Sequence, residues 1–171
     1  MTEQATLYKL MILYMLRQID FSLTLSQMSD FVLGKGYTDY FQLQNAIADL
    51  TESGLIHQEK VRSISYYTIT PEGEQTLDYF EGRLSPGLKE DMKQYLRDNR
   101  VRMRDEVSAV ADYYPGPSGD YLVHCQVRER KSALMDMTLS VPEESMAKAI
   151  CDQWKSRNQE IYAYVMKELM Q

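Results

Sequence analysis

Apolar residues recur at helical spacing in three successive segments of the first half of the chain. Residues 6–19 are apolar on nearly every face, which is expected of a helix that neighbours cover on several sides. A second helix is predicted to begin at the capping box Thr24-x-x-Gln27, and Thr38 is predicted to cap a third helix at about residues 38–53. The apolar positions of this third helix follow the helical period: Leu43, Ala46, Ile47 and Leu50. The pattern predicts a buried helix followed by two helices joined by a tight turn.

After Gly54 the period changes to two. Residues 55–61 and 64–70 alternate in polarity and are separated by Arg62-Ser63, which predicts a β-hairpin. Thr70 precedes Pro71, and this pair predicts a fourth helix, because a hydroxyl caps the first turn and proline is tolerated at the first helical position. Three helices followed by a hairpin predict a winged helix-turn-helix domain, with the hairpin as its wing.

The second half is predicted to hold one long helix, a hairpin and a final helix. The long helix extends from about Pro86 to Asp112 and carries an apolar stripe along one side. Residues 113–119 are rich in proline and glycine and end it. Two alternating segments, residues 123–128 and 135–141, form a hairpin, and Pro142 opens the last helix. The predicted fold class is α+β: a winged helix-turn-helix domain (1–83), a long connecting or dimerisation helix (84–112) and a ββα domain for dimerisation or sensing (113–171).

Composition favours an intracellular globular protein. A chain of 171 residues with 44% hydrophobic content is long enough to bury a core. Its longest apolar stretch, residues 10–16, is too short to cross a bilayer, so we expect a cytoplasmic protein without a membrane partner. Through Arg83 the chain has 6 Lys/Arg against 11 Asp/Glu. This acidic first half argues against indiscriminate affinity for DNA.

Two local motifs resemble those of a known class of regulators. Glu52-Ser-Gly-Leu-Ile56 resembles the close of the recognition helix in bacterial winged-helix regulators, and Tyr67-Thr-Ile-Thr-Pro-Glu-Gly73-Glu-Gln-Thr-Leu77 resembles their exit from the wing. The first half is thus similar to the PadR-like and MarR-like class. The whole chain also resembles a family of winged-helix proteins from Gram-positive anaerobes, for which the resemblance supplies no activity. The resemblance to the regulator class implies a dimeric, cytoplasmic, bacterial transcription regulator that binds DNA.

The third helix is the predicted reader of DNA. If it enters the major groove, its outward side holds Gln42 and Asn45, which could each pair with adenine, and Phe41, which could touch a thymine methyl group. That side carries no lysine or arginine, and Asp49 and Glu52 fit badly beside phosphates. Cations would have to come from the turn and the wing. The predicted DNA-binding residues are Lys35, Thr38, Tyr40, Phe41, Gln42, Gln44, Asn45, Lys60, Arg62 and Ser63.

A second interpretation is a winged-helix module that binds protein rather than DNA. Gln42 and Asn45 would then be ordinary solvated residues, and Phe41 would pack on a partner protein. Phe41 separates the two interpretations, because an exposed phenylalanine suits a hydrophobic contact better than a groove lined with phosphates.

The long helix carries a basic stripe beside its apolar one: Lys89, Lys93, Arg97, Arg100 and Arg104. Like charges so placed need an acidic neighbour, either phosphates or the acidic winged domain of the same or a second subunit. We favour the second explanation, and predict a homodimer joined through this helix and the ββα part. Aromatic residues of the ββα part could line a pocket for a small-molecule effector or simply form its core. At the hairpin tip, an anion site at Arg128, Arg130 and Lys131 is less expected than a solvated loop.

No enzymatic role is predicted. The sequence has no Gly-rich phosphate loop, no G-x-S-x-G elbow and no H-E-x-x-H motif. Its two histidines, His57 and His124, each fall in a predicted strand. Cys125 and Cys151 form no C-x-x-C motif and are interpreted as packed thiols, so neither a metal nor another cofactor is expected.

Overall fold

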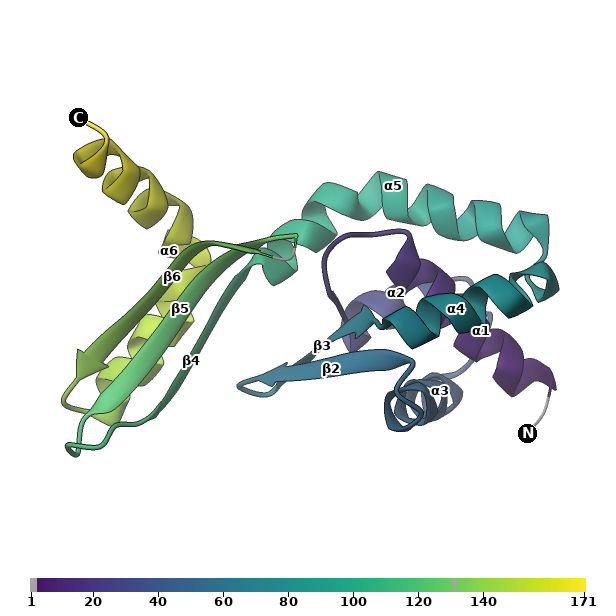
Figure 1. Ribbon diagram of the computed structural model, residues 1–171, viewed down its shortest axis with the longest axis horizontal. Coiled ribbons are helices and arrows are strands. Elements are labelled where there is room, and N and C mark those ends of the chain that lie inside the picture. Colours follow the sequence, from purple (N-terminus) through teal and green to yellow (C-terminus); the bar gives the residue numbers. More distant parts are fainter. Residues whose placement is uncertain (1–2, 131) are drawn as a thin grey trace. The chain divides into compact units, whose positions relative to one another are not determined.

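The computed structural model describes residues 3–130 and 132–171, so the first two residues and Lys131 of the predicted hairpin tip lie outside the described part. The fold is mixed α+β, with six α-helices and two three-stranded antiparallel sheets in the described residues (Figure 1). The elements are, in order, α1 (Glu3–Arg17), β1 (Leu23–Thr24), α2 (Leu25–Gly34), α3 (Tyr40–Glu52), β2 (Ile56–Val61), β3 (Ile64–Ile69), α4 (Pro71–Phe80), the 3-10 turn η1 (Glu81–Arg83), α5 (Pro86–Ser108), β4 (Ala109–Pro115), β5 (Tyr121–Glu129), β6 (Ser132–Val141) and α6 (Glu144–Leu169).

The chain forms two compact units, Met1–Arg104 and Asp105–Gln171, here called the N-terminal and C-terminal units. In the N-terminal unit, α1 is the central core helix, as its continuous apolar sequence predicted. Every residue from Leu10 to Leu16 is buried. The core is completed by buried side chains of the neighbouring helices and strands: Leu23, Met28, Phe31, Leu43, Ile47, Leu50, Ile56 and Leu77.

Side-chain caps begin the short helices of this unit. The predicted capping box of α2 is confirmed, because Thr24 Oγ1 accepts from the Gln27 backbone N–H at 3.2 Å and Gln27 Oε1 accepts from the Thr24 backbone N–H at 3.1 Å. The predicted cap of α3 by Thr38 is wrong. Asp39 caps α3 instead, and its Oδ1 accepts from the Gln42 backbone N–H at 2.9 Å. Thr70 caps α4 at Gly73, as predicted.

The N-terminal sheet has the strand order β1-β3-β2. The predicted hairpin is confirmed by the antiparallel register of β2 and β3, which pairs Ile56 with Ile69 and closes at Val61 and Ile64. The two-residue strand β1 adds to the other edge of β3, with Leu23 opposite Tyr67. Strand β1 was not predicted, because two residues cannot show an alternating pattern.

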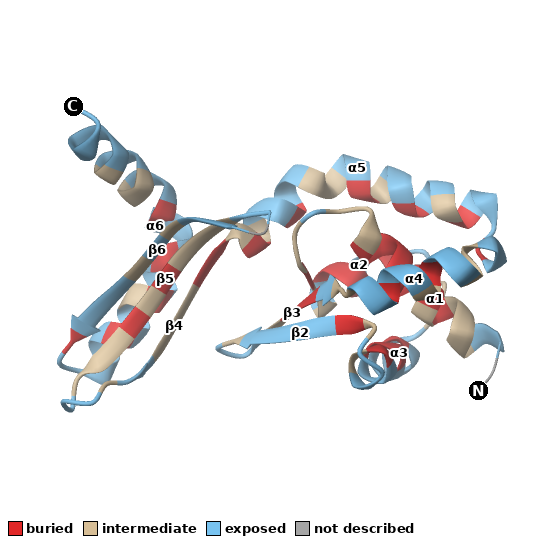
Figure 2. Cartoon of the chain, in the orientation of Figure 1, coloured by how far each residue is buried: buried red, intermediate tan, exposed pale blue. Residues whose placement is uncertain are grey.

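Helix α5 packs its apolar stripe on the core of the N-terminal unit. Leu88, Met92, Leu96 and Met103 are all buried there, and Figure 2 shows the buried residues along one side of α5. Gln27 Nε2 also donates to the carbonyl oxygen of Met103 at 3.0 Å. The stripe that suggested dimerisation through α5 is therefore covered within the same chain.

The prediction that this helix reaches Asp112 is wrong, and so is the prediction of a ββα second half. The helix ends at Ser108, and residues Ala109–Pro115 form β4. This strand pairs antiparallel with β5, from Ala109 opposite Val127 to Pro115 opposite Tyr121. The C-terminal unit is thus a βββα arrangement with the strand order β4-β5-β6.

Helix α6 covers one face of the C-terminal sheet. Trp154 is buried against it, and its Nε1 donates to the carbonyl oxygen of Gln126 at 2.9 Å. Cys125 and Cys151 form no disulfide and are buried in the same core, which confirms the interpretation of packed thiols. Among the described residues, no helix combines the length and the apolar character needed to span a bilayer.

Candidate nucleic-acid interface

Helix α3 buries one side and exposes the other, in the phase that its sequence predicted. Its buried side consists of Leu43, Ala46, Ile47 and Leu50. Its exposed residues are Tyr40, Phe41, Gln42, Gln44, Asn45, Ala48, Asp49 and Glu52. Seven of the ten residues predicted to contact DNA come from α3 or the turn before it, and among these Thr38 differs from the rest. Its Oγ1 is buried and has no hydrogen-bond partner in the described residues, so this hydroxyl does not reach the surface.

The exposed amide side chains of α3 differ in whether a hydrogen bond holds them in place. Gln42 Nε2 donates to Asp39 Oδ2 at 3.2 Å, so the capping aspartate also fixes the neighbouring side chain. Gln44 Nε2 donates to Tyr40 Oη at 3.0 Å. The Asn45 side chain makes no hydrogen bond within the described residues and lies in the middle of the exposed side. It is therefore the amide with both its donor and its acceptor available to a ligand.

An ion pair offsets one of the carboxylates on this surface. Lys9 Nζ on α1 lies 3.1 Å from Asp49 Oδ2. The Lys9 side chain is 15% exposed and that of Asp49 is 53% exposed, so the lysine reaches the acid from the protein side. Lys9 was not among the predicted residues, because this contact joins residues far apart in the chain. It weakens the objection that Asp49 would repel phosphates.

The predicted cations are exposed. Lys35 directly follows α2 as its C-cap residue, while Lys60 and Arg62 lie at the tip of the β2–β3 hairpin with Ser63. Arg62 has a φ of 56°, in the left-handed region that non-glycine residues enter at a cost. The two-residue turn between Val61 and Ile64 requires this conformation, which fixes the direction of the tip.

A groove of about 520 Å³ lies between α3 and the sheet. Its lining combines apolar and polar side chains and contains one carboxylate and no cation: Leu25, Gln44, Ile47, Ala48, Thr51, Glu52, Gln58 and Tyr67. The groove itself therefore offers no favourable field to a phosphate, and any cationic contact must come from its rim.

Residues 8–169 match a family described as "Domain of unknown function (DUF4364)". The chain belongs to this family. Neither the curated proteins nor the solved structures contain a match to the chain. The DUF4364 match includes elements from α1 to α6, so both units belong to the family's common sequence.

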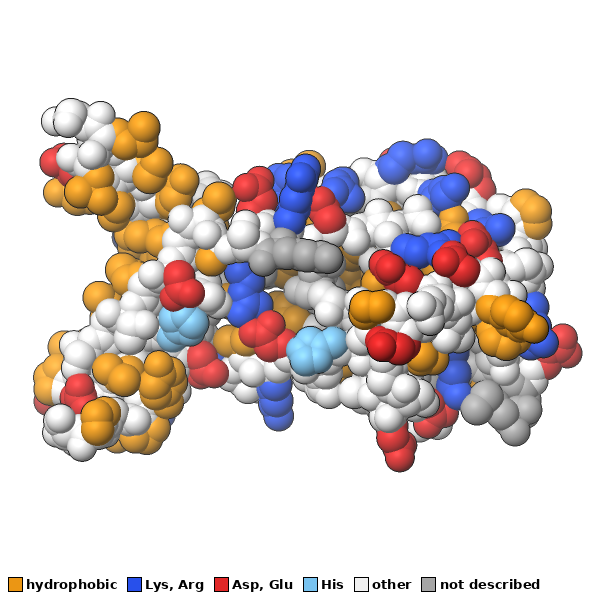
Figure 3. All heavy atoms as spheres, viewed as in Figure 1, with side chains coloured by type: hydrophobic (Ala, Val, Ile, Leu, Met, Phe, Trp, Pro, Cys, Tyr) orange, Lys and Arg blue, Asp and Glu red, His pale blue; other side chains and the backbone are white. Residues whose placement is uncertain are grey.

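The basic stripe on α5 of this DUF4364 protein has acidic partners in its own unit. Arg100 Nη2 lies 2.8 Å from Asp20 Oδ1, and Lys89 Nζ lies 3.8 Å from Glu81 Oε1. Arg97 pairs with Glu90 on the same helix. Figure 3 shows basic side chains over α5 with acidic side chains among them. These pairs support the intramolecular explanation of the stripe, and no phosphate is needed to account for it.

Metal binding finds no support in the described residues. In residues 3–130 and 132–171, no three histidine, cysteine, aspartate or glutamate side chains come close enough together to hold a metal ion.

Proposed function

We propose that this DUF4364 protein is a DNA-binding transcription regulator. In this proposal the N-terminal unit is a winged helix-turn-helix domain of the PadR-like and MarR-like kind. Helix α3 enters the major groove, and the β2–β3 hairpin acts as the wing. The observation that carries the proposal is the exposed Asn45, whose amide has no hydrogen bond within the described residues and which shares the exposed side of α3 with two further amides, Gln42 and Gln44.

The chemistry of the exposed side favours A·T base pairs. An asparagine or glutamine side chain can donate a hydrogen bond to N7 of adenine and accept one from its N6 amino group. The two hydrogen bonds make a bidentate pair. Asn45 is free to do so at once, whereas Gln42 must first release Asp39 Oδ2. Direct contacts with guanine would need an arginine or lysine on α3, and the helix has neither.

In this proposal, only a few cations contribute to the affinity for DNA. Lys35, Lys60 and Arg62 are the exposed cations nearest in sequence to the turn and the wing. Each phosphate contact contributes to the salt dependence of binding, so three contacts per copy predict a shallow salt slope. Two copies on successive grooves would double it, in keeping with dimeric regulators.

A protein-binding module is the second candidate function. Phe41 is 77% exposed at the start of α3, beside Tyr40, which is 44% exposed. Two exposed aromatic residues at one helix end are typical of a hydrophobic contact with another protein. Both candidate functions use α3. They make opposite predictions when the protein is mixed with a duplex, because a regulator binds the duplex and a protein-binding module does not.

Fluorescence anisotropy with A·T-rich and mixed-sequence duplexes over a salt series tests the proposal. Asn45→Ala should reduce the preference for A·T-rich duplexes, because it removes a base contact. Arg62→Gly should weaken binding to all duplexes and flatten the salt slope, because it removes a phosphate contact while glycine keeps the left-handed turn.

Lys93→Ala is the matched control, because Lys93 is an exposed cation on α5, away from the proposed interface. It should leave binding unchanged. Absence of binding to any duplex at low salt would contradict the regulator and favour the protein-binding module. In that case Phe41→Ser should abolish the contact with the partner protein.

A further inference from the structure

Strand β6 is an edge strand that is little protected against pairing along Met135–Val141. It forms one edge of the C-terminal sheet and, in the described residues, pairs only with β5. Nine of its ten residues have a partner there, and a bulge at Leu134 interrupts the register before Met135. Edge strands of stable monomers are commonly short, or they carry a proline, a lysine or a bulge that keeps another strand from pairing with them. The sequence of β6 has no proline or lysine and a single charged residue, Asp136. The opposite edge strand, β4, is shorter and ends at Pro115.

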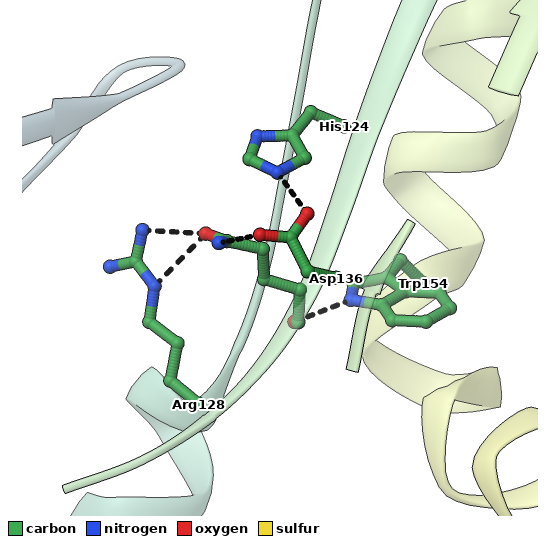
Figure 4. A network of polar contacts seen from close by, with 5 residues as sticks. His124, Arg128, Asp136 and Trp154 are labelled. Carbon is green, nitrogen blue, oxygen red and sulfur yellow. Dashed lines mark hydrogen bonds and ion pairs between the residues drawn. The ribbon is translucent and has the colours of Figure 1, made fainter. Parts of the chain in front are cut away.

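The single charge of β6 is bound to the neighbouring strand. Asp136 Oδ1 lies 2.6 Å from His124 Nε2, and Gln126 Nε2 donates to Asp136 Oδ2 at 2.9 Å (Figure 4). Gln126 Oε1 in turn accepts from Arg128 Nη2 at 2.8 Å. Both oxygens of Asp136 are thus directed towards β5 and not past the free edge, so the carboxylate does little to keep another strand away.

The helix face of β6 is incompletely covered. Helix α6 packs mainly against β4 and β5. On the same side of β6, Met135 and Met137 are only partly buried, and Leu139 is 38% exposed. The apolar side of α6 also continues past Asn158, its last buried residue, to Leu169, which is 78% exposed. The free edge and the uncovered apolar residues belong to the same unit.

We propose that β6 pairs antiparallel with β6 of a second copy of this chain, about a two-fold axis through Met137. The two sheets then form one continuous sheet of six strands, with both α6 helices on the same face. In this register Met137 lies opposite its own copy and Met135 lies opposite Leu139. Asp136 lies opposite Thr138, a residue able to donate a hydrogen bond to it.

Self-complementarity identifies a second copy as the partner. An isologous interface requires one surface patch to match itself, and β6 does so with apolar residues opposite apolar ones on the helix face. Moving the axis by one residue to Asp136 would place two carboxylates directly opposite each other, which is unfavourable. The interface proposed here does not rest on DNA binding. It replaces α5 as the predicted dimer contact.

Disulfide cross-linking tests both the contact and its register. In the proposed register the two Cα atoms at position 137 lie about 4.5–5.5 Å apart, within the range of a disulfide. Met137→Cys should therefore form a covalent dimer on mild oxidation. Thr138→Cys is the matched control, because its two copies would be displaced along the strands and lie beyond about 7 Å. The wild-type thiols are buried and should give no cross-link.

Analytical ultracentrifugation supplies the second measurement. The wild type should sediment as a dimer at tens of micromolar. Leu134→Lys, at a residue 48% exposed on the edge strand, should shift it towards monomer without changing the circular dichroism spectrum. A wild-type monomer would overturn the proposal and leave the edge open to an extended segment of another protein. A dimer that Met137→Cys fails to cross-link would place the contact elsewhere and overturn it equally.

Discussion

The carbonyl oxygen of Leu55 occupies the space that a Cβ on Gly73 would need. The same oxygen accepts hydrogen bonds from the Thr70 backbone N–H at 3.1 Å and from Thr70 Oγ1 at 2.9 Å, so the start of α4 and the residue before β2 are held together. Gly73 is the glycine of the motif Tyr67-Thr-Ile-Thr-Pro-Glu-Gly73, and its role here is close approach of two backbone segments.

Gly73→Ala is expected to destabilise the protein by at least about 2 kcal/mol, because a backbone carbonyl cannot move aside as a flexible side chain does. Urea unfolding followed by circular dichroism measures the change. Gly87→Ala is the control: it meets no atom within 4 Å in helix α5 and should be neutral or stabilising by up to about 1 kcal/mol. Equal stabilities for the two variants would contradict the role assigned to Gly73.

Burial makes the Cys125 thiol unreactive. Desolvation, with a smaller contribution from Cys151, raises the pKa of Cys125 to about 11. At pH 8 roughly one molecule in a thousand then carries the thiolate, which is the reactive form. Ellman's reagent should therefore modify neither cysteine of the native protein at pH 8 within minutes, and both in urea. Rapid labelling of the native protein would show that the C-terminal core opens readily.

The local pattern of the sequence was sufficient to predict those helices for which the capping residue and the apolar period indicate the same start. Thr24 with Gln27 and Thr70 with Pro71 each place a capping group before a helical period, and both helices begin there. At the start of α3 two capping residues stand side by side, and the pattern cannot tell Thr38 from Asp39. The choice depends on burial of the Thr38 hydroxyl, which is a tertiary effect.

Strand β4 shows where local pattern fails. Val107 and Val110 continue the helical spacing of α5, so the segment fits a helix as well as a strand. Pairing of Ala109 with Val127 decides in favour of the strand, and that partner is distant in the sequence. The same limit applies to the candidate interface. The exposed side of α3 follows from its period, whereas the ion pair of Lys9 with Asp49 exists only in the folded chain.

The hydrogen bonds of Asp136 should be visible in its titration. Gln126 and then His124 donate to the carboxylate and hold the pKa of Asp136 below its ordinary value. Because the folded pKa is lowered, the stabilising contribution is present above the ordinary pKa and is lost as the pH falls through the folded one. Gln126→Ala should raise the pKa of Asp136 measured by carboxyl NMR. An unchanged titration midpoint would show that the Gln126 contact does not persist in solution.

Asp49→Asn tests the electrostatics of the candidate interface. It should strengthen DNA binding, whereas Arg62→Gly should weaken it. If α3 lies in the major groove, Asp49→Asn removes a negative charge near the phosphates and should tighten binding several-fold at low salt. The gain should diminish as salt is added, because screening weakens the repulsion between Asp49 and the phosphates. The loss of stability should stay below about 1 kcal/mol, since Asp49 is more than half exposed and such pairs contribute little. Anisotropy titrations at two salt concentrations measure the change. Equal affinities for wild type and Asp49→Asn in a protein that does bind DNA would mean that another surface than α3 holds the duplex.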